Sequence, residues 1–216
     1  MTQDAMRWPP RGARKLNLGC GLDVRPASDG WVNMDALALH PDIVRHDMIH
    51  KPWPFPDDHF DAVLASNVLE HVPLIYADHG GWQRDVIYDV MEEIHRVLKP
   101  GGKLHALVPV AGSHNAWANA QHYRHFVPES LMFGFSQRDS RGERCRLAGH
   151  DADLRLAELG FNRVGARWPG FWRMGPSKLG AMAHAVVRAP WLKPLLSPKA
   201  EIEAILVAHK RGVPSA

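Results

Sequence analysis

Cysteine is scarce in this chain of 216 residues, which contains only Cys20 and Cys145. Two cysteines are too few for a disulfide framework or for a zinc site built from cysteines, and they suit a reducing compartment. The sequence also lacks any run of about 20 apolar residues, and its first residues lack the apolar stretch of a signal peptide. We therefore expect a cytoplasmic protein without a membrane partner.

A strong charge of one sign is missing as well. The chain has 26 Lys and Arg against 23 Asp and Glu, a formal net charge of +3, and its 14 His gain charge only below about pH 6.5. This weak basicity gives no reason to expect a nucleic-acid partner. The chain contains 18 glycines and 17 prolines, fewer than a low-complexity sequence has. Its share of 45% hydrophobic residues is typical of a protein with one globular core. We expect a single domain over residues 14–216 after an N-terminal arm at 1–13, where consecutive prolines oppose regular structure.

Apolar segments alternate with helical patterns along the rest of the chain. The clearest helical pattern covers 83–98, where apolar residues recur with a 3.6-residue period until Lys-Pro-Gly-Gly at 99–102 ends it. Shorter helices are expected from Pro128 and over 151–159, and residues 111–126 read as a long loop. Strands are predicted over 15–19, 31–35, 43–47, 60–66, 103–109, 161–168 and 201–209. This alternation predicts the α/β class, with a doubly wound and mostly parallel sheet.

Two connections in this pattern are short. Nine residues separate Gly21 from Trp31 and seven separate Asp35 from Ile43, so the helices after the first two strands must be shortened. One face of the sheet then loses cover. The segment 169–198, rich in Trp, Leu, Ala and Met, or a second copy of the chain in a homodimer, is expected to supply it. Segments 111–150 and 169–198 are the candidate lid or insert segments.

Polar and small residues follow the predicted strands, where ligands of open α/β sheets bind. Gly19 and Gly21 allow the backbone to approach a ligand closely. Asp35 ends the second strand, where it could accept hydrogen bonds from a ribose diol. Asn67 and His71 follow the fourth strand, where the reacting end of a ligand would lie. Each has an ordinary explanation as a turn or surface residue, but together, in this order, they indicate a site for a ligand with an adenosyl or phosphate group.

At these positions the sequence resembles the class I S-adenosylmethionine-dependent methyltransferases, in particular the small methyltransferase-domain group. The resemblance covers about residues 15–168 and rests on KLNLGCG (15–21), GWVNMD (30–35), FPDDHFD (55–61), VLEHV (68–72), RVLKPGG (96–102) and QHYRHFVPES (121–130). It implies a Rossmann-like methyltransferase fold with S-adenosyl-L-methionine as cofactor. The cofactor-binding residues that it implies are Asn17, Gly19, Cys20, Gly21, Asp35, Asp47, Met48, Asn67 and Val68.

Two positions depart from the pattern of this family. Asn17 stands where the first strand usually ends in an acid, and Asp23 stands where a third glycine is usual. These departures keep a non-catalytic adenosyl-binding or scaffold protein open as the alternative function. A nicotinamide dehydrogenase is disfavoured, because its glycine pattern needs a glycine where this chain has Val24.

Methyl transfer to a hydroxyl, thiol or ammonium group requires the loss of a proton from the acceptor. The candidate bases are His71, His122 and His125. The candidate acceptor-binding residues are His114, Tyr123 and Arg124. A metal site on His122 and His125, with His114 or His71, is disfavoured, because the stretch around His122 and His125 is a predicted loop without an accompanying carboxylate pattern. The Asn/Asp-Pro-Pro-aromatic motif of adenine methylation is absent after the fourth strand. We therefore expect O- or N-methylation of a small molecule, with natural-product and sugar modification as candidate settings.

Overall fold

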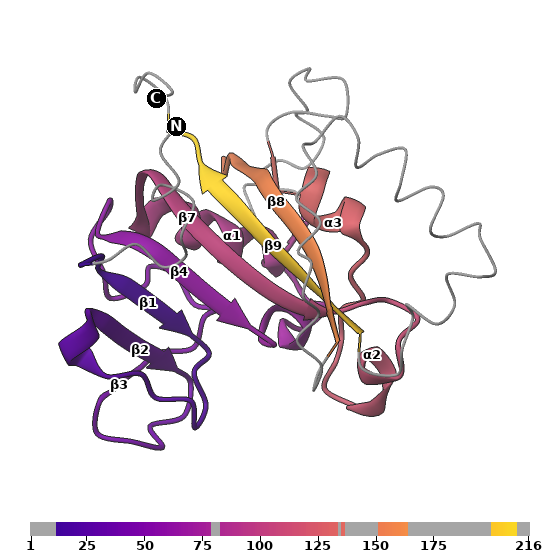
Figure 1. Cartoon of the computed structure of the whole chain (residues 1–216), viewed down its shortest axis with the longest axis horizontal. Helices are drawn as coiled ribbons and strands as arrows, with labels where there is room; N and C mark the ends of the chain where they lie inside the picture. The colour runs from indigo at the N-terminus through magenta and orange to yellow at the C-terminus, as the bar shows by residue number, and fades with distance from the viewer. Residues whose placement is uncertain (1–11, 79–82, 134, 137–150, 164–199, 211–216) are drawn as a thin grey trace.

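A seven-stranded sheet organises the computed structural model (Figure 1), which describes residues 12–78, 83–133, 135–136, 151–163 and 200–210. The strand order is β3-β2-β1-β4-β7-β9-β8. The strands are β1 (Lys15–Leu18), β2 (Trp31–Asp35), β3 (Ile43–Arg45), β4 (Phe60–Ser66), β7 (Leu98–Pro109), β8 (Leu154–Arg163) and β9 (Ala200–Ala208). The first five run parallel, whereas β9 is antiparallel to both β7 and β8. The doubly wound, mostly parallel sheet is confirmed.

Short elements connect the first strands. A 3-10 helix, η2 (Ala27–Asp29), lies between β1 and β2, and residues 36–42 join β2 to β3 through turns without a helix. After β4 come the 3-10 helix η3 (Leu69–His71) and a small antiparallel hairpin of β5 (Tyr76–Asp78) and β6 (Gln83–Asp85). The remaining helices are α1 (Val86–Val97), α2 (His114–Ala118) and α3 (Pro128–Phe133). None of these described helices has the length and apolar character needed to cross a membrane.

Helix α1 lies behind the sheet in Figure 1 and supplies much of the core. Its N-terminus is capped by Asp85, whose carboxylate accepts a hydrogen bond from the Ile87 N–H. Its apolar face, which includes the fully buried Val90 and Ile94, joins one core cluster with strand residues such as Leu16. The predicted helix is therefore confirmed, although it begins three residues later, because 83–85 pair as β6.

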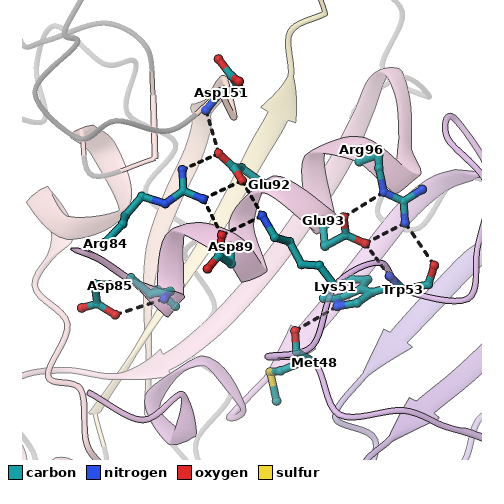
Figure 2. Close-up of polar contacts among 11 residues, drawn as sticks. Met48, Lys51, Trp53, Arg84, Asp85, Asp89, Glu92, Glu93, Arg96 and Asp151 are labelled. Carbon is teal, nitrogen blue, oxygen red and sulfur yellow. Dashed lines mark hydrogen bonds and ion pairs between the residues drawn. The ribbon is translucent and has the colours of Figure 1, made fainter. Parts of the chain in front are cut away.

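The opposite, charged side of α1 holds two ionic clusters, which Figure 2 shows side by side. In the first, the buried Arg84 guanidinium donates to Glu92 at 2.7 Å and also pairs with Asp89. Lys51 Nζ lies 2.7 Å from the Asp89 carboxylate and 3.1 Å from that of Glu92. The backbone N–H of Asp151 donates to Glu92 at 3.0 Å. Through these contacts the segments that precede β4 and β8, as well as strand β6, are bound to helix α1.

The second cluster holds the proline-rich segment 52–56 against α1 (Figure 2). The Glu93 carboxylate accepts the backbone N–H of Trp53 at 2.6 Å and two guanidinium N–H groups of Arg96 at 2.7 and 2.9 Å. Arg96 also donates to the carbonyl oxygens of Trp53 and Phe55 and to the exposed carboxylate of Asp57. A segment that cannot form regular backbone ladders thereby has its polar groups satisfied by side chains.

The helix predicted over 151–159 is wrong, because residues 154–159 belong to β8 and residues 151–153 form no helix. The register of β8 against β9 shifts between Leu156 and Glu158, which marks a bulge with one extra residue. Leu154 and Leu159 are both buried, although residues an odd number of positions apart face opposite sides of a regular strand. The bulge thus changes the spacing of the buried apolar residues from the two-residue period of a regular strand. For this reason the sequence pattern wrongly predicted a helix here.

Other boundaries also differ from the sequence predictions. The strand expected over 103–109 begins earlier, at Leu98, and the predicted loop 111–126 contains the short helix α2, which Ser113 caps. The arm at 1–11, residues 137–150 of the first candidate insert and the whole segment 169–198 lie outside the described residues, as do 164–168 of the predicted strand 161–168.

Candidate active site

A cavity of about 420 Å³ opens at the carboxyl ends of β1, β2 and β4. The chain builds β2 and β3 on one side of β1 and β4 on the other, so this is the point where the strand order reverses and where ligands of such sheets bind. The residues that line the cavity are Leu18, Gly19, Gly21, Met34, Asp35, Ala36, Leu37, Leu39, His46, Met48, Asn67, Val68, His71 and Gln121. Seven of the predicted site residues are therefore brought together: Gly19, Gly21, Asp35, Met48, Asn67, Val68 and His71.

The glycine turn after β1 is held tightly at its first residue and is open at its third. Gly19 has φ +60°, and a Cβ there would lie 2.1 Å from Cγ2 of Val68. Its N–H donates to the carbonyl of Met34 at 2.8 Å, which ties the turn to β2. Gly21 also has positive φ, but a Cβ there would meet nothing within 4 Å. The turn therefore leaves free space beside its backbone, which suits the close approach of a ligand.

Asp35 is fixed at the end of β2 by backbone donors from both sides of the cavity. Its Oδ2 accepts the N–H of Gly21 and its Oδ1 accepts the N–H of Leu37, each at 2.9 Å. A carboxylate offers about four lone-pair sites, so each oxygen keeps capacity for a further donor. This geometry can receive a pair of adjacent hydroxyl groups, as a ribose diol presents.

Three residues that the resemblance assigned to the cofactor do not line the cavity. Asn17 is only 2% exposed, and its amide donates to the carbonyl of Asp23 at 2.7 Å and to the side chain of Asn33 at 3.1 Å. It therefore positions the glycine turn from behind. Cys20 is buried, and burial raises the pKa of its thiol. The Asp47 carboxylate accepts the N–H of Ile49 at 3.2 Å, while the next residue, Met48, faces the cavity.

Asn67 turns the chain sharply at the end of β4. Its φ of 51° lies in the left-handed region, which asparagine tolerates better than most residues, and its N–H donates to the carbonyl of Leu107 at 2.9 Å. Its side chain donates to the carboxylate of Glu201, at the beginning of β9. Because β9 is antiparallel to β7, its first residues reach the same edge of the sheet as the cavity. Glu201 was not predicted as a site residue.

Directly after Asn67, η3 brings a carboxylate and an imidazole together with a second imidazole from the loop after α2. One potential ligand atom from each of Glu70, His71 and His122 lies within 4.8 Å of the others. The rings of His71 and His122 meet edge to face with centroids 4.8 Å apart. The sequence argument against a metal was that no carboxylate accompanies the histidines, and Glu70 supplies one here.

The groups of this cluster have few hydrogen-bond partners. Glu70 is 1% exposed, and neither of its carboxylate oxygens has a hydrogen-bond partner among the described residues. Burial, together with the nearby charge of Glu201, raises the pKa of Glu70 to about 7. Nδ1 of His122 is likewise buried without a partner among them. The ring of His71 donates to the carbonyl of Gln121, and burial followed by the neighbouring His122 lowers its pKa.

Arg124 differs from the expectation that it holds an acceptor. Its guanidinium donates to the carbonyls of Val72 and Pro73 at 2.8 and 2.6 Å and forms a two-pronged pair with Asp85 at 2.5 and 2.9 Å. The backbone N–H groups of Tyr123 and Arg124 both donate to the carbonyl of Glu70. Arg124 therefore anchors the loop that carries His122, and its side chain does not line the cavity.

The other predicted acceptor-side residues also lie away from the cavity lining. His125 is exposed and stacks on the exposed ring of Trp117, with centroids 3.8 Å apart. His114 is exposed at the start of α2, and Tyr123 is 45% exposed. Apart from Glu70 and Glu201, the sequence reasoning missed His46 and Gln121. Glu70 lay within the quoted VLEHV segment and Gln121 within QHYRHFVPES, so two of these four had a local signal.

Comparison with known proteins agrees with this geometry. Residues 14–106 match a family model described as a methyltransferase domain. Residues 14–106 of the chain are therefore a methyltransferase domain. No curated protein sequence matches the chain.

Two solved structures show the same fold as this methyltransferase. One is a putative methyltransferase of Haloferax volcanii, solved in complex with the Trm112 methyltransferase activator. It has 18% identity and a TM-score of 0.52, with 93% of this chain and 84% of that chain covered. The other is the YcgJ protein of Bacillus subtilis, with 12% identity and a TM-score of 0.50, and with 93% of each chain covered.

The cofactor of this methyltransferase is S-adenosylmethionine, and the cavity fits it. Asp35 keeps lone pairs for the two ribose hydroxyls after binding its backbone donors. The apolar side chains of Leu39 and Met48 line the cavity and would contact the adenine, while the open space at Gly21 would admit the methionine part. When bound, the cofactor supplies a methyl group on a sulfonium, which any correctly placed nucleophile can accept.

Proposed function

We propose that this methyltransferase acts on a hydroxyl or amino group of a small molecule, which binds beside His71 at the end of the cavity beyond Asn67. The observation that carries the proposal is the position of the Glu70, His71 and His122 cluster. His71 lines the same cavity as Asp35, so one cavity reaches both the diol-binding carboxylate and the imidazole that heads this cluster.

The residues at the two ends of this cavity have separate tasks. Methyl transfer is an in-line displacement, so the protein contributes mainly by holding the reacting atoms in line within a space that excludes water. Asp35 and the glycine turn would fix the cofactor. The cluster would bind the acceptor and make its proton easier to remove, which a hydroxyl or ammonium acceptor requires.

The lining of the cavity supports a small acceptor. Among the described lining residues, apolar side chains predominate, His46 and His71 are the titratable bases, and there is neither lysine nor arginine. A nucleic-acid acceptor would need basic side chains to neutralise its phosphates. Small-molecule pockets are typically apolar with a few polar groups of this kind.

Binding of S-adenosylhomocysteine is the first test, with NAD as the control ligand. At an affinity near ~10 µM, ~1 mM ligand should raise the unfolding temperature by roughly 5 to 10 °C for a chain of this size. Asp35→Asn should weaken binding by about 10 to 100-fold, because the ribose hydroxyls lose a charged acceptor. Asp42→Asn is the matched control, since Asp42 is exposed in the next loop and does not line the cavity.

Acceptor screening follows with the wild-type protein, comparing phenols, alcohols and amines. Transfer to one of these classes that is lost in Asp35→Asn would support the proposal. Absence of S-adenosylhomocysteine binding would overturn it and would favour the scaffold alternative.

A further inference from the structure

Next to the acceptor end of the cavity, which His71 lines, lies a set of side chains that metal ions use as ligands. Glu70, His71 and His122 each place one ligand atom within 4.8 Å of the other two. Ligands about 2.1 Å from a metal lie at most about 4 Å apart around it. In a tetrahedral site the ligands are about 3.4 Å apart, so a contraction of at most about 1.4 Å by side-chain rotation would bring the three atoms onto one ion.

A buried carboxylate without a partner points to a missing cation. Glu70 is 1% exposed with both oxygens unpartnered, although nearly all buried polar groups in folded proteins have a hydrogen-bond partner. Nδ1 of His122 is in the same situation. A second carboxylate, Glu201, is 9% exposed and close enough for its charge to act on Glu70. An isolated negative charge in such a place is costly, and a cation among these groups removes the cost.

The surrounding backbone already fixes the three side chains in this arrangement. The ring of His71 donates to the carbonyl of Gln121, the type of outer contact that orients metal-bound histidines. The carbonyl of Glu70 accepts N–H groups from Tyr123 and Arg124, at 2.9 and 3.2 Å, so the loop of His122 is tied to η3. Arg124 anchors that loop further through its pair with Asp85.

We propose that Glu70, His71 and His122 bind one divalent first-row transition-metal ion. Two imidazoles and one carboxylate form a ligand set that leaves coordination positions open, as catalytic metal sites require. Because His71 lines the cavity, the open positions lie at its acceptor end. In this arrangement His71 and His122 are ligands and do not serve as free bases.

The metal site also indicates the acceptor class, an inference that rests on the proposed function. An acceptor hydroxyl bound to the ion has a lowered pKa and loses its proton to water. Its oxygen then forms a bond to the methyl carbon while the carbon–sulfur bond breaks, and the electron pair of that bond remains on sulfur, which becomes a neutral thioether. The acceptor is therefore an alcohol or a phenol, with an adjacent oxygen as a second ligand where the molecule has one.

Metal binding is tested on the full chain, purified metal-free and titrated with Zn²⁺, Mn²⁺ or Co²⁺ by calorimetry, with the visible absorption of bound Co²⁺ as a second readout. The wild type should bind one equivalent, and metal at about 100 times its Kd should raise the unfolding temperature by roughly 5 to 10 °C. Glu70→Gln and His122→Ala should each weaken binding more than ~10-fold. His125→Ala is the matched control from the same loop and should bind as the wild type does.

Binding of S-adenosylhomocysteine by each variant serves as the check of folding. Absence of a one-equivalent site, or equal weakening by His125→Ala and Glu70→Gln, would overturn the metal site. Cofactor binding without metal binding would remove the inference and leave the proposed function in place. Metal binding without methyl transfer to any hydroxyl acceptor would instead leave the metal site and overturn the acceptor class inferred from it.

Discussion

Replacing Glu93 by glutamine removes the negative charge on which the second ionic cluster depends. The carboxylate accepts one backbone N–H from Trp53 and two N–H groups from Arg96 (Figure 2). A glutamine side chain has a single acceptor oxygen, and its NH2 group would face donors. At least one of these N–H groups therefore loses its acceptor, while Arg96 keeps its charge.

The expected cost follows from the burial of the partners. Glu93 is almost fully buried, as is Trp53, whereas the Arg96 side chain is 25% exposed and can recover part of its hydration. Breaking a fully buried ion pair costs about 3–5 kcal/mol, and a hydrogen bond to a charged group contributes about 1.5–3 kcal/mol. Because Arg96 is partly exposed, the loss for Glu93→Gln should lie between these two ranges, at about 2–4 kcal/mol of unfolding free energy. For a chain of this size, that lowers the unfolding temperature by roughly 4 to 16 °C.

Urea unfolding followed by tryptophan fluorescence measures this loss as a shift in midpoint at constant slope. Asp57→Asn is the matched control, because Asp57 binds the same Arg96 from an exposed position, and its midpoint should not move measurably. In a double-mutant cycle with Arg96→Met, the two losses should be strongly non-additive. A Glu93→Gln loss below about 1 kcal/mol, or equal effects of the two acid substitutions, would refute the reasoning.

Two other changes test the fold and the cavity. Burial alone would raise the pKa of Glu92, but hydrogen bonds led by that from Arg84 outweigh it and lower the pKa to about 2. The ionised Glu92 carboxylate therefore contributes at most about 3 kcal/mol to the unfolding free energy above pH 4.5, and this contribution is lost as the pH falls towards 2. The unfolding free energy of Glu92→Gln should accordingly fall less steeply over this pH range than that of the wild type. Gly19→Ala places a Cβ 2.1 Å from Val68, so it should lower the unfolding free energy by about 2–5 kcal/mol and remove most of the affinity for S-adenosylhomocysteine. Gly112→Ala is the control, because Gly112 has positive φ but open space around it, and it should lower the unfolding free energy by only about 1–2 kcal/mol. Equal losses in the two variants would contradict the argument from the Val68 contact.

Local patterns were sufficient for the elements whose neighbours along the chain decide their structure. The bounds of β2 and β4 coincide with the predicted segments 31–35 and 60–66, because each is an apolar run between turn-forming residues. Gly19 and Asp35 were likewise found from their positions after strands, since parallel strands place such residues at one edge.

Contacts between distant segments could not be predicted in this way. The bulge in β8 depends on its register with β9 and is invisible to a periodicity argument. Arg124 was expected at the acceptor, but its partner Asp85 lies 39 residues away. Glu70 and His122 come from separate elements that meet only through the backbone bonds between η3 and the loop.

The carboxylate of Asp35, which lines the cavity, and that of Glu70, beside His71, differ in their hydrogen-bond donors. Asp35 accepts one backbone N–H on each oxygen, so its charge is stabilised without a ligand, and a neutral diol needs only its remaining lone pairs. Neither carboxylate oxygen of Glu70 has a hydrogen-bond partner among the described residues, and burial together with the nearby charge of Glu201 raises its pKa, so its negative form is destabilised. Because β9 runs antiparallel to the strands that bear both sites, Glu201 at its beginning lies near Asn67 and Glu70. The topology thus brings the carboxylates of Glu70 and Glu201 near each other beside His71, which is the arrangement on which the proposed metal site rests.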